Sequence, residues 1–309
     1  MRIVSLLPSA TEIVHALGLG YQLVGVSHDC DFPPQVRNLP RVSACAIADP
    51  ARSSAEVDRW VRERLAAGVP LYELDAAVLR ALRPDWILTQ DLCAVCAPDY
   101  GSVAALAAAL PGPPRVLNLE ASTLEGVLGT VTAVAAALGV AERGAEVVAG
   151  LRARIAAVAR AVVQAPHRPR TAVLEWLDPL FCSGHWTPEL VTLAGGEEVL
   201  GHPGAPSIVK QWDELAGARP EALVIACCGQ SAERASQDWE RIRQRPEVRD
   251  LPAVRARRVQ LVDGNAYFNR PGPRLVDSLE LLGRFLHPGY FSRREAHGMA
   301  VGADHVRSD

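Results

Sequence analysis

Residues 2–18 read RIVSLLPSATEIVHALG, a short apolar run that turns at Pro8-Ser9 and continues into a helix-like segment. The same order returns past the midpoint, where TAVLEWL (171–177) leads through a Gly-containing loop into TPELVTLAGG (187–196). Two more segments have echoes in the same order, 82–88 in 218–225 and 115–119 in 258–262. This repetition predicts two similar α/β lobes, and a cleft between lobes is where small ligands are usually held.

The composition is that of a globular protein. The chain has 309 residues, 49% of them hydrophobic and 22% charged, a length that suggests about two domains. A formal net charge of −3 and the lack of a Lys/Arg run argue against nucleic-acid binding. No stretch approaches the ~18–20 apolar residues of a membrane span. Seven cysteines, an odd number in a chain of this size, argue against a disulfide framework.

The first lobe is expected to alternate short buried strands with helices. The expected strands are 2–7, 22–27, 86–90 and 115–119, and the expected helices are 10–18, 53–67, 75–82, 99–110 and 122–138. Ser53 and Glu56 have the spacing of a capping box. Apolar residues then recur at helical spacing over 141–164, between the two repeats. We therefore expect an N-terminal lobe (1–140), a connecting backbone helix (141–166), a C-terminal lobe (167–290) and a flexible tail (291–309).

Two loops of the first lobe carry residues with binding chemistry. His28, Asp29 and Cys30 follow the second strand, where a parallel sheet presents its ligand edge. Cys93-Ala94-Val95-Cys96 follows the 86–90 strand, with a spacing that suits a redox pair or half of a zinc site. The alternative interpretations are an ordinary turn for the first loop and packing for the second. If the loops meet, Cys30, Cys93 and Cys96 could bind a metal.

The second lobe offers aromatic and polar candidates. Trp176, His185 and Trp186 suit a large flat ligand, because aromatic side chains give wide apolar contact. The alternative is core packing, which the sequence favours for Trp176 over Trp186. Tyr267, Asn269 and Arg270 follow the 258–262 strand and could make polar contacts, or form a plain strand-to-helix loop. The remaining cysteines are interpreted as small buried hydrophobes: Cys45, Cys182, Cys227 and Cys228.

Several enzyme motifs are missing from the sequence. There is no Gly-x-Gly-x-x-Gly after a strand, no Walker loop and no Gly-x-Ser-x-Gly elbow. We therefore expect a non-catalytic protein.

The opening Ser-Leu-x-Pro-Ser-x-Thr-Glu, together with Val24–His28, Arg83–Ile87 and Asn269–Arg274, resembles the helical-backbone (class III) solute-binding proteins of ABC importers, in the cobalamin and iron-siderophore branch. The likeness extends over about residues 1–286. It implies two Rossmann-like lobes with parallel sheets joined by a single long helix, a corrinoid such as cobalamin between the lobes, and an ABC transporter permease as partner. No signal-peptide pattern precedes the apolar run that begins at Ile3. The expected location is therefore cytoplasmic as written, or periplasmic or extracellular if the start is truncated.

The sequence thus predicts a non-catalytic corrinoid-binding protein. The residues expected to line its cleft are Pro8, Ser9, His28, Trp176, His185, Trp186, Tyr267, Asn269 and Arg270. One alternative is an intracellular metal-binding or redox protein that holds zinc or iron through Cys30, Cys93 and Cys96. Another is a siderophore or haem binder, since the same cleft can hold any large flat chelate.

Overall fold

The computed structural model describes residues 1–45, 52–91 and 98–291. It divides into two compact units. The first unit comprises Met1–Leu151 with Arg270–Pro273, and the second comprises Arg152–Asn269 with Arg274–Asp309. Residues 270–273 thus belong to the first unit, although their neighbours in the sequence on both sides belong to the second.

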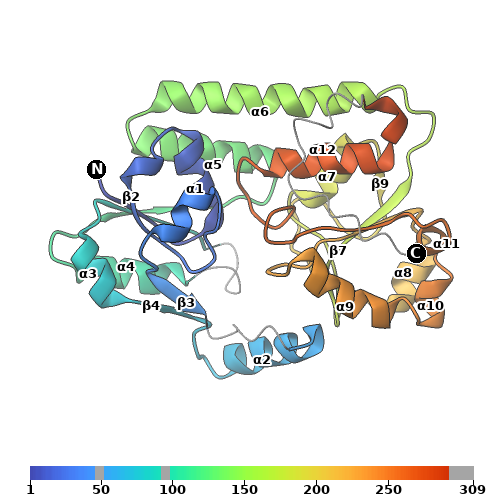
Figure 1. Ribbon diagram of the computed structural model, residues 1–309, viewed down its shortest axis with the longest axis horizontal. Helices are drawn as coiled ribbons and strands as arrows, with labels where there is room; N and C mark the ends of the chain where they lie inside the picture. Colours follow the sequence, from blue (N-terminus) through green and yellow to red (C-terminus); the bar gives the residue numbers. More distant parts are fainter. Residues whose placement is uncertain (46–51, 92–97, 292–309) are drawn as a thin grey trace. The chain divides into compact units, whose positions relative to one another are not determined.

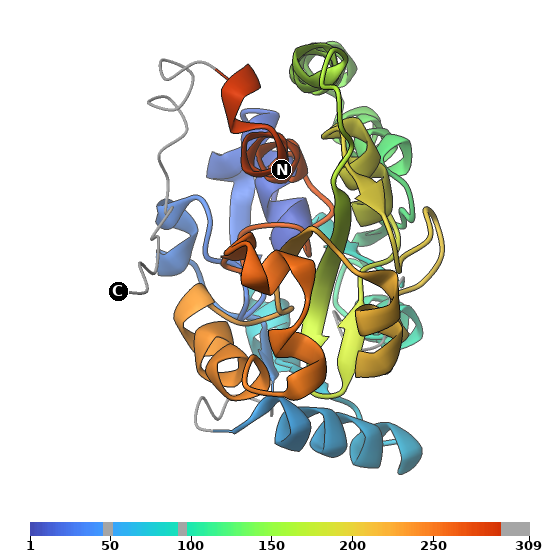
Figure 2. The same cartoon turned by 90° about the vertical axis from the view of Figure 1, so that its right-hand side faces the viewer.

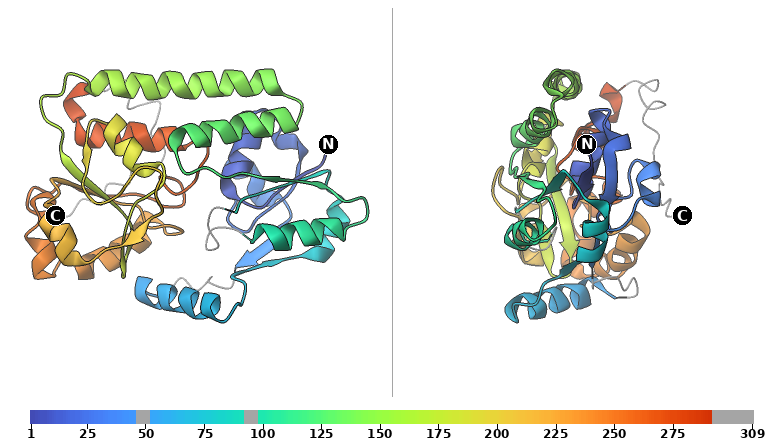
Figure 3. Two further views of the ribbon diagram at one scale, coloured as in Figure 1. Left: turned by 180° about the vertical axis from the view of Figure 1, so that it is seen from behind. Right: turned by 90° about the vertical axis from the view of Figure 1, so that its left-hand side faces the viewer.

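The first unit is built on a four-stranded parallel sheet of order β2-β1-β5-β6 (Figure 1). Its strands are β1 (Ile3–Ser5), β2 (Leu23–Val26), β5 (Trp86–Thr89) and β6 (Arg115–Asn118). All four lie within the predicted ranges, so this part of the predicted fold is confirmed. Figure 3 shows α1 (Pro8–Ala16) and α5 (Leu124–Ala137) on one side of the sheet, and α4 (Tyr100–Ala108) on the other. Helix α3 (Ala76–Leu82) shares the α4 side, where Leu79 and Val103 pack with Val4 and Ile87.

A second, antiparallel pair of strands in this unit was not predicted. Strand β3 (Ser43–Cys45) pairs with β4 (Tyr72–Leu74). Three-residue strands are too short to show a period of two in the sequence. Helix α2 (Ser54–Ala66) lies between them in the chain and begins with the predicted capping box, in which Ser53 and Glu56 cap each other's backbone N–H groups.

The second unit has a mixed sheet of order β10-β8-β7-β11-β12, and β9 also pairs with β7. Strands β7 (Arg170–Leu177), β11 (Ala222–Ile225) and β12 (Val259–Leu261) are parallel, as the sequence predicts. Strand β9 (Glu197–Glu198), which is parallel to β7, was not predicted. Strands β8 (Leu180–Cys182) and β10 (Ile208–Val209) are antiparallel additions that the sequence did not reveal. They extend one edge of the parallel sheet by a hairpin.

Helices cover both faces of this sheet (Figure 2). Helices α7 (Thr187–Leu193) and α12 (Leu275–Leu286) contact each other over one face. The other face packs its buried leucines against α8 (Trp212–Ala218), α9 (Ala232–Ile242), α10 (Pro246–Arg249) and α11 (Pro252–Arg255). The fold class is therefore α/β in both units.

The repeat seen in the sequence has a structural counterpart at a helix end. Helix α3 ends at Arg83 with a φ of 44°, and α8 ends at Arg219 with a φ of 48°. Each left-handed residue is followed by a proline, Pro84 or Pro220, and then by a strand. A left-handed residue closes a helix, and a proline just beyond it prevents the helix from continuing.

Helix α6 (Ala141–Val162) matches the predicted connector and runs from the first unit into the second. In the first unit it lies close to α5, because a Cβ on Gly144 would be 2.3 Å from the Cβ of Ala135. In the second unit, the Arg154 guanidinium donates to both carboxylate oxygens of Glu280 on α12, each at 2.8 Å. These hydrogen bonds raise the pKa of Arg154. None of the helices in the described ranges combines the length and apolar character needed to cross a membrane.

Candidate functional site

The carboxyl ends of the first unit's parallel strands lie at one edge of the sheet. Several residues predicted to contact a ligand lie in the loops that follow these strands. Pro8 and Ser9 come after β1, and the loop 27–31 comes after β2. Pro8 is part-exposed, but Ser9 is buried. A Cβ on Gly272 would lie 3.3 Å from Ser9 Cα, so the 270–273 segment packs directly on Ser9.

Cys30 lies inside a buried network of hydroxyl groups. Its Sγ is 3.1 Å from Thr11 Oγ1 and 3.2 Å from Ser27 Oγ, and Thr11 Oγ1 donates to Ser5 Oγ at 2.9 Å. Burial raises the pKa of the Cys30 thiol, which keeps it in the neutral form. The structure thus places this thiol among hydroxyl groups of the core, as expected of a small buried residue.

The proposed metal site therefore finds no support in the part of the chain that the structure describes. Cys93 and Cys96 lie outside the described residues. Within 1–45, 52–91 and 98–291, no group of three or more His, Cys, Asp or Glu side chains is placed to hold a metal ion.

His28 is fixed by neighbours at both ring nitrogens. Its Nδ1 is 2.9 Å from Ser43 Oγ on β3, and its Nε2 is 3.3 Å from Asp29 Oδ2. Its ring centroid is 5.4 Å from that of Tyr72 on β4. Burial lowers the pKa of His28, against an opposing effect of Asp29. The β3–β4 pair thus orients His28, and no local sequence pattern indicates this contact.

Arg270 forms a buried ion-pair cluster in the first unit. Its Nη1 donates to Asp31 Oδ1 at 2.6 Å and lies 3.5 Å from Glu12 Oε1, and its Nη2 donates to the Asp29 carbonyl at 3.2 Å. The guanidinium thereby fastens 270–273 to the loop after β2. The sequence predicted Arg270 as a ligand contact, whereas its donors here serve the fold.

Asn269 has a similar internal role in the second unit. Its Nδ2 donates to the carbonyls of Ala226, at 2.9 Å, and Gly264, at 3.1 Å. Both amide hydrogens therefore tie together the loops that follow β11 and β12. Only the amide oxygen remains as a predicted ligand contact.

The second unit's edge can be located from the strand register. Leu174 of β7 pairs both with Ile225, the last residue of β11, and with Cys182, the last residue of β8. The loop 183–186 therefore leaves the sheet at the level where β11 ends. Trp176, two residues beyond Leu174, packs partly on the core and donates its Nε1 hydrogen to the Asp178 carbonyl at 3.1 Å.

Trp186 is buried, with 6% of its surface exposed, although the sequence favoured a ligand contact over a core role for this residue. Its Nε1 donates to the Phe268 carbonyl at 2.6 Å. Phe268 is itself buried and has a φ of 68°. A positive φ is unusual for a bulky residue and persists only where the surroundings impose it. The Trp186 indole and the Ser278 hydroxyl, which accepts the Phe268 N–H at 2.9 Å, provide those surroundings.

His185 is the one residue of 182–188 that is not buried. It too has a left-handed backbone, with a φ of 51°. Its N–H donates to the Ala205 carbonyl at 2.6 Å, and its carbonyl accepts the Gly204 N–H at 2.9 Å. The ring centroid lies 5.5 Å from that of Trp186, and burial lowers the pKa of the imidazole. The backbone of His185 is thus clamped on both sides while its ring reaches the surface.

Glu198 supports the loop that holds His185. Its Oε1 accepts the backbone N–H groups of Val199, Leu200 and Gly201 at 2.9–3.1 Å. Its Oε2 is buried and makes no hydrogen bond within the described part of the chain. Burial raises the pKa of Glu198 to about 7.

Of the two cysteines that follow β11, only one is buried as the sequence predicts. Cys227 is fully buried, and burial raises the pKa of its thiol to about 12, as expected of a packing residue. Cys228 was also expected to be buried, but it is exposed. The strand's buried run ends at Cys227, so its neighbour turns outward. Tyr267, after β12, is part-exposed, and burial raises the pKa of its phenol.

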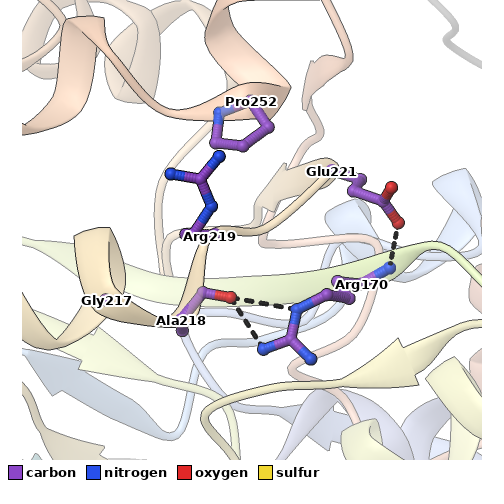
Figure 4. Close-up of a pocket in the computed structure, with 6 residues that line it drawn as sticks. All are labelled: Arg170, Gly217, Ala218, Arg219, Glu221 and Pro252. Atoms are coloured by element: carbon purple, nitrogen blue, oxygen red, sulfur yellow. Dashed lines mark hydrogen bonds between the residues drawn. The ribbon is translucent and has the colours of Figure 1, made fainter.

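A cavity of about 400 Å³ opens elsewhere on the second unit (Figure 4). Arg170 and Glu221, at the amino ends of β7 and β11, line it together with Arg219 and Pro252. Arg170 donates to the Ala218 carbonyl, and its backbone N–H donates to Glu221. None of the predicted ligand residues lines this cavity, which lies at the opposite edge of the sheet from the predicted site.

Comparison with known proteins identifies the family. A family model described as periplasmic binding protein matches residues 79–266. The vitamin B12-binding protein of Vibrio cholerae serotype O1 is 57% identical over 42 residues, which cover 14% of this chain and only 15% of that relative. The vitamin B12-binding protein of Vibrio parahaemolyticus is 23% identical over 293 residues, covering 90% of this chain and 86% of the relative.

Among solved structures, the periplasmic haem-binding protein RhuT from Roseiflexus sp. RS-1 is similar with a TM-score of 0.70. The two are 22% identical, with 94% of this chain and 99% of that chain covered. This likeness shows the fold. The family model spans more than half of the sequence. The chain therefore belongs to the periplasmic binding protein family.

Proposed function

We propose that this chain is a non-catalytic binding protein for a corrinoid, with ring side chains at the carboxyl edge of the second unit's sheet among its contacts. The observation that carries the proposal is the set of part-exposed ring side chains at the second unit's edge, Trp176, His185 and Tyr267. Such rings offer wide apolar contact at low entropic cost, which suits a broad, flat ligand. The likeness to vitamin B12-binding proteins along most of the chain supports the same ligand class.

A binding role is consistent with the chemistry at the first unit's edge. Cys30 is a buried neutral thiol, and both ring nitrogens of His28 have partners. These contacts hold the loop after β2 in place, as a binding surface that is formed before the ligand arrives requires.

The proposed partner is an ABC transporter permease that accepts the ligand from this protein. A protein that collects a ligand for import works outside the cytoplasmic membrane, so we propose a periplasmic or extracellular location rather than a cytoplasmic one. The family's description as periplasmic supports this location.

Haem is the second candidate ligand, because the fold is similar to that of a haem-binding protein. Haem and corrinoids are both broad, planar metal chelates, and an edge of exposed rings suits either. An iron siderophore is less flat and offers the rings less surface to cover.

The test is direct binding by the purified chain. Cyanocobalamin, haemin and a ferric hydroxamate siderophore are titrated separately by calorimetry, and co-elution of visible absorbance with the protein is measured by gel filtration. We expect stoichiometric cobalamin binding that weakens when Trp176 is changed to Ala. Zinc and iron salts form the control arm for the metal-protein alternative. Stoichiometric uptake of a metal ion without any chelate binding would refute the proposal.

A further inference from the structure

Glu175 marks the point at which β7 leaves the buried part of the second unit's sheet. The four residues before it, Thr171–Leu174, are fully buried, whereas Glu175 is part-exposed. Because Leu174 pairs with Ile225, the last residue of β11, Glu175 is the first residue of β7 beyond the end of that neighbouring strand. Its backbone carbonyl accepts the Cys228 N–H at 3.0 Å. A carboxyl group therefore lies at the carboxyl edge of this sheet, where α/β sheets bind their ligands.

The Glu175 carboxylate is held by a second loop of the same unit. The Ser207 hydroxyl donates to Glu175 Oε2 at 2.5 Å. Ser207 directly precedes β10, whose first residue, Ile208, pairs with Cys182 at the end of β8. The backbone of Ser207 is itself closely packed, because a Cβ on Gly184 would lie 2.5 Å from its nitrogen. A short hydrogen bond from a hydroxyl to a carboxylate is a strong one, and it fixes the direction of the Glu175 side chain.

The negative charge of Glu175 acts on the thiols at both sides of β7. Burial is the main cause of the raised pKa of Cys182, and the charges of Glu198 and Glu175 add to it. Burial is also the main cause of the raised pKa of Cys227, and the charge of Glu175 again adds to it. Cys182 ends β8 and Cys227 follows β11, and these two strands flank β7. The charge is therefore felt at both strand ends that border the proposed ligand contacts.

A carboxylate at this edge discriminates between ligands by what they carry at their rim. Its oxygens only accept hydrogen bonds and offer about four lone-pair sites, so the bond from Ser207 leaves room for further donors. An amide N–H of a ligand is such a donor, whereas a ligand carboxylate is repelled as a like charge. The two candidate chelates differ in this respect, because corrinoids carry amide side chains around the ring and haem carries propionate carboxylates.

We propose that the Glu175 carboxylate accepts a hydrogen bond from a peripheral amide of the bound corrinoid, and thereby disfavours chelates that present a carboxylate at the same place. The inference rests on the proposed function and narrows its ligand to amide-bearing corrinoids. Glu175 selects by the chemistry of the ligand's rim, while the ring side chains at this edge provide contact that any flat chelate receives.

Dicyanocobinamide and dicyanocobyrinic acid are the probes. Both have the corrin ring with cyanide at both axial positions of cobalt, and they differ in carrying amides or carboxylates at the rim. Each is titrated by calorimetry, at one ionic strength, into the wild type, Glu175→Gln and Glu240→Gln. Glutamine keeps the size of the Glu175 side chain and an oxygen that can accept from Ser207, but it removes the charge. Glu240→Gln is the matched control, because it removes the same charge from an exposed residue of α9 in the same unit.

The measured quantity is the ratio of the two affinities on one protein. Partial unfolding of a variant lowers both affinities and leaves this ratio unchanged. We expect the wild type and Glu240→Gln to bind dicyanocobinamide at least about 10-fold more tightly than dicyanocobyrinic acid, and Glu175→Gln to reduce the ratio by about 10-fold.

Two results would overturn the role of Glu175 while leaving the binding function intact. One is a wild-type ratio near unity, or one that Glu175→Gln leaves unchanged. The other is an equal fall of the ratio in Glu240→Gln, which would assign the preference to the net charge of the protein. If the wild type binds neither corrinoid, the proposed function fails first, and the inference falls with it.

Discussion

Replacing Arg270 by Met tests whether this residue serves the fold or the ligand. Arg270 has 9% of its side chain exposed, and of the two carboxylates near it Glu12 has 2% and Asp31 has 43% exposed. Removing one partner of a buried ion pair costs about 3–5 kcal/mol, because the other charge is left without compensation. Asp31 can return to water, so we expect a loss just below that range, about 2–3 kcal/mol in the free energy of unfolding.

Urea denaturation followed by circular dichroism measures this loss, with ligand affinity measured by calorimetry well below the transition. Arg143→Met is the matched control, since Arg143 and Glu146 form an exposed pair on α6. Exposed pairs contribute at most about 1 kcal/mol. We expect Arg270→Met to lower the urea midpoint far more than the control and to change affinity less than about 10-fold. Unchanged stability with lost affinity would refute the structural role and restore Arg270 as a ligand contact.

Three further outcomes are expected. The pKa of Glu198 is raised from 4.5 to about 7 in the folded protein, so the folded state holds this proton more tightly than the unfolded chain. The free energy of unfolding should therefore fall as pH rises between those two values, and urea midpoints at pH 5 and pH 8 should differ less in Glu198→Gln than in the wild type. A thiol reagent should label Cys228 in the native protein and Cys227 only after unfolding, as peptide mass spectrometry will show; equal native labelling would contradict the burial of Cys227. Changing Cys93 and Cys96 to Ser should weaken ligand or metal binding in a titration, and unchanged affinity would reduce the pair to packing residues.

The repeated sequence pattern predicted the central strands because buried parallel strands are short, apolar and bounded by breakers. The Arg-Pro pairs at 83–84 and 219–220 close helices before strands in both units, which is why the segments around them look alike. Local rules of this kind depend only on neighbours in the chain. The β3–β4 pair and the β8–β10 additions were not predicted, because they lie outside the repeated apolar runs and are too short to show a period of two.

The candidate site was less predictable, because its contacts are distant in sequence. The Trp186 indole donates a hydrogen bond to a carbonyl 82 residues away, and Arg270 pairs with Asp31 across 239 residues. No local pattern distinguishes such a residue from one that faces a ligand. The sequence predicts burial for both Cys227 and Cys228, but the buried segment that contains β11 ends between them. Sequence reasoning thus found the right loops but could not tell which side chains the fold already uses.

The carboxyl edges of the two sheets differ in how many of their side chains already have partners within the same unit. In the first unit, the side chains of Cys30, His28 and Arg270 all make contacts within the unit. Substitutions there should therefore lower the free energy of unfolding more than they lower ligand affinity. In the second unit, His185 keeps a free ring on a clamped backbone, and Cys228 remains exposed. Under the proposed function, discrimination between ligands should therefore depend on the second unit, while the first unit contributes a surface whose shape is set by its own internal contacts.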